Sequence, residues 1–85
     1  MDPQAQHIEE VLALLDAVKG AAPSFPQGNA RELVTKGETT VALENLCDNL
    51  FELGVQLPIP VREDLVEACK GASVAERYWE DFKVE

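Results

Sequence analysis

The chain has 85 residues, of which 46% are hydrophobic and 27% are charged. A chain this short does not divide into separate cores, and its apolar share is that of a globular protein, so we expect one folded domain over residues 1–85 and exclude disorder along the whole length. Sixteen Asp and Glu against seven Lys and Arg give a formal net charge of −9, which disfavours direct binding to nucleic acid or to an anionic membrane surface.

The positions of the acidic and apolar residues indicate where a binding face lies and whether the chain enters a membrane. Ten of the sixteen acidic residues lie in residues 44–85, so an acidic binding face is expected in the second half of the chain. The densest apolar run, residues 11–15, is far shorter than the ~20 residues that cross a bilayer. We therefore expect a cytoplasmic protein without a membrane partner.

The first twenty residues predict an amphipathic helix. Asp2 is a candidate N-cap, Pro3 suits the first helical position, and the helix is expected to end near Gly20. Its apolar residues recur every three or four positions, as one face of a helix requires: Ile8, Val11, Leu12, Leu15 and Val18.

A loop and a short second helix follow. Residues 21–28 contain two prolines, a serine and a glycine, which predicts a loop anchored by Phe25. Asn29 and Glu32 have the spacing of a capping box and predict the start of a brief helix. Gly37 can end that helix in a left-handed conformation.

The central helix is predicted over residues 38–53, where no Gly or Pro intervenes. One arc of its helical wheel is apolar and is expected to face the core: Leu43, Leu46, Cys47, Leu50, Phe51 and Leu53. The opposite arc gathers four carboxylates and two amides, which we call the acidic stripe: Glu38, Glu44, Asn45, Asp48, Asn49 and Glu52.

Two further helices are predicted after Gly54, which ends the central helix. Residues 55–60 contain two prolines and favour an extended link, and helical spacing of apolar residues then predicts a helix over residues 61–71. Ser73 and Glu76 form a second capping box before a short helix that carries Val74, Tyr78, Trp79 and Phe82. Because no segment alternates with period two, we predict an all-α, compact single-domain bundle of four to five short helices.

No residue pattern predicts catalysis, a cofactor or a metal. Cys47 and Cys69 do not form a disulfide framework or a zinc pattern, and we expect both to be buried free thiols. His7 is the only histidine and has no nucleophile arranged around it. Neither Ser24 nor Ser73 stands between Asp and Leu, as the attachment site of a phosphopantetheine carrier would require. We therefore expect a protein that is not an enzyme.

The acidic stripe has two interpretations. One is an ordinary solvated helix face, because surface charge needs no partner. The other is electrostatic docking: Glu44, Asp48 and Glu52 are spaced i, i+4, i+8, so neighbouring like charges repel by a few tenths of a kcal/mol (~0.2–0.5 per pair). A cationic partner would relieve that repulsion.

Residues 37–53, GETTVALENLCDNLFEL, resemble the signature of the MafI family of bacterial immunity proteins. A Gly-Glu pair is followed by Ala-Leu-Glu-Asn-Leu and then by Asp-x-Leu with a nearby Glu. The matching positions are Gly37, Glu38, Ala42, Leu43, Glu44, Asn45, Leu46, Asp48, Leu50 and Glu52. A looser similarity extends over about residues 30–82 and includes Tyr78 and Trp79.

The resemblance implies a small cytoplasmic antitoxin that binds and neutralises the C-terminal toxic domain of a secreted polymorphic toxin, without turning over a substrate. An acidic protein can cover the basic cleft of a nuclease-type toxin, so we expect the acidic stripe to bind the toxin, with Phe25, Tyr78 or Trp79 as a candidate apolar anchor. The alternatives are an acidic helical adaptor or regulatory module, and a nucleic-acid mimic that binds a basic non-toxin protein. The sequence predicts neither the toxin's identity nor the oligomeric state.

Overall fold

The computed structural model describes residues 3–84 and, within them, contains helices and no strand. The all-α prediction is therefore confirmed. Five α-helices are followed by one 3₁₀ turn: α1 (Pro3–Ala21), α2 (Ala30–Thr35), α3 (Thr39–Glu52), α4 (Ile59–Gly71), α5 (Glu76–Trp79) and η1 (Glu80–Phe82). Asp2, the predicted N-cap of the first helix, lies outside the described residues.

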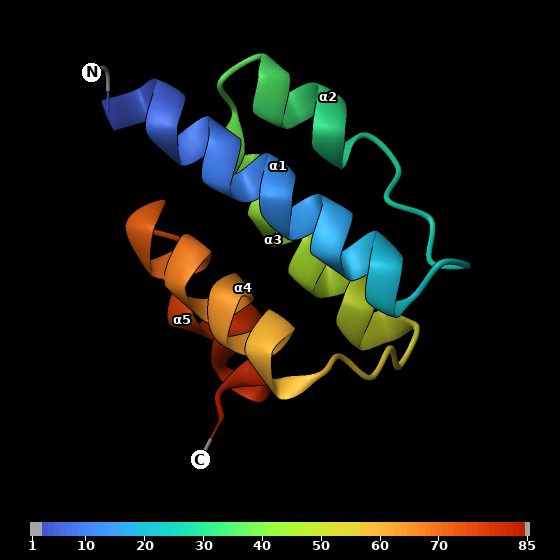
Figure 1. The fold of residues 1–85 in the computed structure, drawn as a ribbon. Helices are drawn as coiled ribbons and strands as arrows, with labels where there is room; N and C mark the ends of the chain where they lie inside the picture. The colour runs from blue at the N-terminus through green and yellow to red at the C-terminus, as the bar shows by residue number, and fades with distance from the viewer. Residues whose placement is uncertain (1–2, 85) are drawn as a thin grey trace.

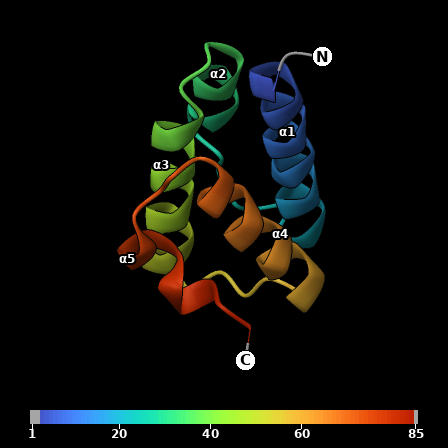
Figure 2. The same cartoon turned by 90° about the vertical axis from the view of Figure 1, so that its left-hand side faces the viewer.

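The helices enclose one core. Helix α1 packs against α2 and α4, while α3 packs against α2, α4 and α5. Figure 1 shows α1 and α4 side by side with α3 behind them, and Figure 2 shows α1 and α3 as two upright helices with α4 between them. Helix α3 thus has one side toward the interior and the other toward solvent.

The core is apolar, and no polar or charged residue of the described chain is buried in it. Its largest fully buried side chains come from four helices: Leu15, Leu43, Leu46, Leu50, Leu65, Val11, Val18, Val34, Cys47 and Cys69. Phe25 is buried as well, which confirms it as the anchor of the loop between α1 and α2.

The predicted core arc of α3 is too wide. Leu43, Leu46, Cys47 and Leu50 are buried, but Phe51 is 65% exposed and Leu53 is 60% exposed. Phe51 is turned by about 100° from Leu50, which places it at the edge of the apolar arc, beside the acidic stripe. Leu53 is the C-cap residue and follows the last helical residue of α3.

Helices α2, α3 and α4 end in the same hydrogen-bonded turn, the Schellman motif. Gly37 and Gly54 have positive φ angles of 85° and 64°, so both end their helices as predicted. After α4 the left-handed residue is Ser73, with φ of 58°, while Gly71 stays helical. There the Val74 amide donates to the Cys69 carbonyl at 2.9 Å, as the motif requires.

The predicted helix starts are less accurate. The side chains of Asn29 and Ser73 make no capping hydrogen bond, so both predicted capping boxes are wrong. The residue that caps α5 is Ala75, because Ser73 belongs to the turn that ends α4. Helix α4 begins at Ile59 rather than at residue 61, since Pro60 fits the first turn of a helix, where no backbone N–H is needed.

Three side-chain hydrogen bonds fasten the C-terminal segment to the bundle. The indole Nε1 of Trp79 donates to the Val74 carbonyl at 3.0 Å. The guanidinium of Arg62 donates to the carbonyls of Phe82 and Lys83, at 3.3 and 3.0 Å. Because Trp79 and Phe82 are buried, this short segment completes the core next to α3 and α4.

We predict that adjacent substitutions on α3 have very different effects on stability. Leu50→Ala removes a side chain with 0% exposure and should lower the free energy of unfolding by about 2–5 kcal/mol. Phe51→Ala removes an exposed side chain and should change it by less than about 0.5 kcal/mol. Urea denaturation followed by circular dichroism measures both values. Equal losses would contradict the observed rotation of α3.

We also predict that Ser73→Gly stabilises the protein. The left-handed conformation costs an ordinary residue about 1–2 kcal/mol, and the greater freedom of glycine in the unfolded chain offsets part of the gain, so about 0.5–1 kcal/mol should remain. Gly54→Ser is the matched control, because an added Cβ at Gly54 meets no neighbouring atom. This control should lose stability by a similar amount in the same denaturation assay. A loss of stability in Ser73→Gly would show that the Ser73 side chain stabilises the turn.

Candidate functional site

The solvent-facing side of α3 carries the predicted acidic stripe. Asn45, Asp48, Asn49 and Glu52 are exposed and Glu44 is half-buried. Glu38, the N-cap residue of α3, is exposed at the start of the same helix. The six residues therefore share one helix and lie at the surface because the leucines between them are packed in the core.

The carboxylates of the acidic stripe are not neutralised locally. Within the described residues, no ion pair or side-chain hydrogen bond involves Glu38, Glu44, Asp48 or Glu52. The ion pairs of the described residues lie elsewhere: Arg31–Asp16, Lys36–Glu32, Lys70–Glu67 and Lys83–Glu76. Helix α3 has no basic residue of its own, so the stripe presents negative charge to solvent.

One cation flanks the stripe. Asp48 lines a shallow depression of about 310 Å³ together with Arg77 and Tyr78 of α5. The guanidinium of Arg77 lies 4.8 Å from the centre of the Tyr78 ring and donates to the Tyr78 hydroxyl at 3.1 Å. Arg77 is thus held by Tyr78 rather than by Asp48.

Apolar side chains interrupt this acidic face. Val41 is 45% exposed near the start of α3, and Phe51 is the exposed aromatic near its end. Sequence reasoning placed Phe51 in the core and named Phe25, Tyr78 and Trp79 as possible anchors. Phe25 and Trp79 are buried and Tyr78 is half-buried. The signal that could have identified Phe51 is its position on the helical wheel next to Glu44 and Asp48.

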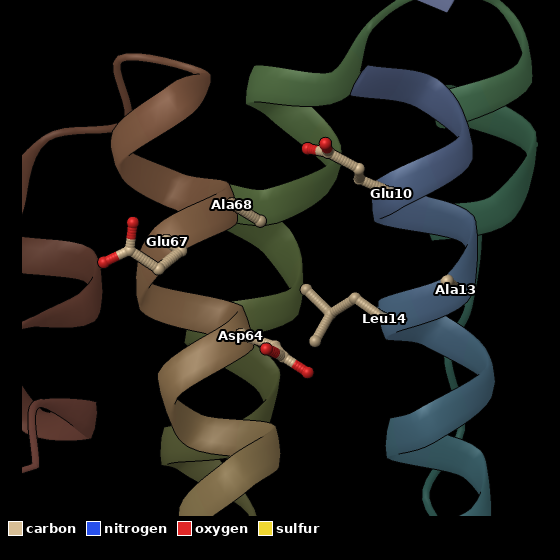
Figure 3. Close-up of a pocket in the computed structure, with 6 residues that line it drawn as sticks. All are labelled: Glu10, Ala13, Leu14, Asp64, Glu67 and Ala68. Carbon is tan, nitrogen blue, oxygen red and sulfur yellow. The ribbon is translucent and has the colours of Figure 1, made fainter. Parts of the chain in front are cut away.

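A second acidic surface, a groove between α1 and α4, was not predicted. The groove has a volume of about 510 Å³, and its apolar floor carries a rim of three acids; it is lined by Glu10, Ala13, Leu14, Asp64, Glu67 and Ala68. Figure 3 shows the carboxylates of Glu10 and Asp64 turned toward the groove from opposite helices, while that of Glu67 points away. The sequence could not reveal this groove because its two sides are brought together only by the packing of α1 on α4.

The groove and the stripe occupy different faces of the molecule. In Figure 3 helix α3 lies behind the groove, and its leucines Leu43, Leu46 and Leu50 are buried in the core. The acidic stripe is on the far side of α3. No group of three or more His, Cys, Asp and Glu residues within the described chain is arranged to hold a metal ion.

The two cysteines are free and buried, as predicted. Cys47 on α3 and Cys69 on α4 are in contact, with 3.7 Å between their sulfur atoms, and either thiol can donate to the other. The contact with Cys69 and burial raise the pKa of the Cys47 thiol well above its ordinary value. A buried, protonated thiol is a poor nucleophile, so this pair belongs to the core.

His7 is also part of the packing. Its Nδ1 lies 3.7 Å from a carboxylate oxygen of Glu10, and its ring lies over Gly71 at the end of α4, where an added Cβ would be 3.4 Å from the His7 Cε1. These two contacts place His7 between its own helix and the end of α4. The position of His7 provides no catalytic pair.

Comparison with protein-family models, with curated proteins and with solved structures gives no match to this chain. Among the described helices, none combines the length and the hydropathy of a membrane-spanning segment.

The raised pKa of Cys47 predicts a loss of stability at alkaline pH. An unfolded chain releases the thiol proton above about pH 8.5, whereas the folded protein retains it. The free energy of unfolding is therefore unaffected by ionisation of this thiol below that pH and falls above it, by up to about 1.4 kcal/mol per pH unit. Urea denaturation under reducing conditions between pH 7 and 10 measures the slope. Cys47→Ala should flatten this slope, and an unchanged slope would assign it to other groups.

Proposed function

We propose that this chain is an immunity-type protein that binds and neutralises a basic toxin domain through the acidic stripe of α3. One observation carries the proposal: several carboxylates on one face of α3 form no ion pair with any cation of the described residues. The buried leucines on the opposite side of the helix hold this face toward solvent. The resemblance of residues 37–53 to the MafI family supports the same function. The protein would act by binding alone, in the cytoplasm, without a cofactor.

The spacing of the carboxylates supports binding to a cleft that normally holds nucleic acid. Glu44, Asp48 and Glu52 are one turn apart, so they span about 12 Å along the helix axis. Phosphates along one nucleic-acid strand are separated by about 3.4 Å of axial rise, so this row of negative charge covers the length of several phosphates. Carboxylates in such a cleft exclude the substrate both sterically and electrostatically.

Complementary charge also suits the timing of inhibition. Opposite fields on two proteins raise the association rate toward about 10⁸–10⁹ M⁻¹s⁻¹ at low salt. A toxin must be captured before it acts, so fast association is an advantage. The amides of Asn45 and Asn49 add hydrogen-bonding groups between the charges without further repulsion.

The acidic groove between α1 and α4 favours a second candidate function. Carboxylates on two separate faces are suited to an acidic adaptor or a nucleic-acid mimic that binds a basic protein other than a toxin. In that case the two acids that face the groove, Glu10 and Asp64, would contribute to binding as much as the stripe does.

Paired charge reversals distinguish the two functions. The chain is co-expressed with candidate toxin domains of basic charge, and cell growth is measured. Asp48→Lys with Glu52→Lys should abolish growth rescue and weaken binding at least about 100-fold, because two like charges then face the basic cleft. Glu10→Lys with Asp64→Lys is the matched control, with the same change of charge at the groove, and should rescue fully.

The folding of both double variants is checked by circular dichroism, since all four residues are exposed. Full rescue by the folded stripe variant would contradict the proposed docking face. Loss of rescue in the groove variant alone would favour the adaptor or mimic. An affinity that does not change between low and high salt would contradict electrostatic docking.

A further inference from the structure

We infer that Phe51 is the apolar anchor of the docking face and that it packs against apolar side chains of a partner protein that are bordered by Lys and Arg. This inference rests on the proposed function and adds to it the chemistry of the partner's binding surface. Phe51 is the most exposed large hydrophobic side chain of the described residues. It also lies directly against the acidic stripe.

The exposure of Phe51 has no explanation in the packing of the monomer. The preceding residue, Leu50, is completely buried and fills the core at that level of α3. The other phenylalanines, Phe25 and Phe82, and the single tryptophan, Trp79, are all buried. An aromatic ring left in water beside carboxylates is typical of a binding hot spot, where a large rigid side chain loses little entropy on docking.

The surface around Phe51 is shaped for contact with another protein. On one side of the turn after α3, a hollow of about 290 Å³ is lined by Leu50, Phe51, Gly54, Val55, Leu57 and Phe82 among others. On the other side of this turn, a hollow of about 320 Å³ lies between Leu53 and the Pro23–Pro26 loop, and Val55 borders both. Phe51 therefore lines a hollow of mixed character, to which Gln56, Arg62 and Asp81 also contribute, and Leu53 lines a mainly apolar one. Both lie at the end of α3 that is nearer the link to α4 (Figure 2).

The charges around Phe51 identify the kind of partner. Asp48 lies one turn before Phe51, Glu52 follows it, and Asp81 lines the same hollow. The one cation that lines this hollow, Arg62, already donates to the carbonyls of Phe82 and Lys83. A second copy of this chain would bring Glu52 and Asp81 against like charges, and an anionic lipid surface would be repelled. A protein surface with apolar side chains bordered by Lys and Arg is complementary to both features.

The anchor and the stripe are expected to control different rate constants. Exposed charges steer the encounter and mainly change the association rate, whereas a buried aromatic contact mainly changes the dissociation rate. Loss of Phe51 should therefore leave the salt dependence of binding intact. Loss of the stripe charges should remove this dependence.

The test uses two synthetic probes and the intact ¹⁵N-labelled protein. One probe is an amphipathic helical peptide of Leu and Lys, and the other has the same Lys residues with Ser in place of Leu. NMR titration at low salt should show that the Leu/Lys peptide binds at least about 10-fold more tightly and shifts the amides of Phe51 and residues 53–57. Phe51→Ser should remove this difference. Val41→Ser, which changes an exposed apolar residue of the same helix face, should retain it.

Other outcomes of these measurements would contradict the inference about Phe51. The role of Phe51 as the anchor would be contradicted by chemical-shift changes centred on Val41 or on the groove between α1 and α4. It would also be contradicted if Phe51→Ser still bound the Leu/Lys peptide more tightly than the Ser/Lys peptide. A further contradicting result in sedimentation is a dimer that forms with rising concentration and that Phe51→Ser abolishes. This result would assign the surface to a second copy of the chain. Both variants change exposed side chains, and their thermal melts confirm that the fold is retained.

Cell rescue separates this inference from the proposed function. If Asp48→Lys with Glu52→Lys abolishes rescue while Phe51→Ser preserves it, the immunity function stands and the anchor is refuted. If the Leu/Lys peptide maps to Phe51 but the chain protects no cell from the toxin domain, the anchor stands and the immunity function is refuted. In a complex with the toxin domain, Phe51→Ser should raise the dissociation rate at least about 30-fold.

Discussion

The burial of one row of side chains on α3 determines the direction in which the acidic stripe points. Leu43, Leu46 and Leu50 are almost completely removed from water, and each contributes about 1.5–3 kcal/mol through burial. A rotation of the helix by one residue would expose this row and bury carboxylates, which is far more costly. The orientation of Asp48 and Glu52 therefore follows from the packing of the leucines, even though neither acid is part of the core.

The periodicity of apolar residues predicted the helices and the fold class, because a buried face must recur every three or four residues. Gly37 and Gly54 were predictable as helix ends because few other residues adopt positive φ. Ser73 takes the same conformation without that signal, and Asn29 has the spacing of a cap without its hydrogen bond. These features depend on how the chain enters and leaves each helix. The exposure of Phe51 and the acidic groove between α1 and α4 depend on tertiary packing, which a pattern along one helix does not specify.

Folding and recognition use separate parts of the sequence. The described core contains no buried polar residue, so its stability comes from apolar packing and owes little to charge. The carboxylates that line the stripe and the groove are therefore free to repel one another at modest cost, because they are solvated. Phe51 connects the two parts, because it belongs to the apolar arc of α3 by sequence and to the outer face by structure. This separation allows the surface to change its partner while the helices stay in place.

The environment of Trp79 gives the molecule a built-in optical reporter. This single tryptophan is buried, its indole nitrogen is bonded to the Val74 carbonyl, and the ammonium groups of Lys70 and Lys83 lie 5.6 and 5.2 Å from the ring centre. Its emission therefore registers the docking of the C-terminal segment onto α3 and α4. Fluorescence can follow loosening of that segment without any introduced label.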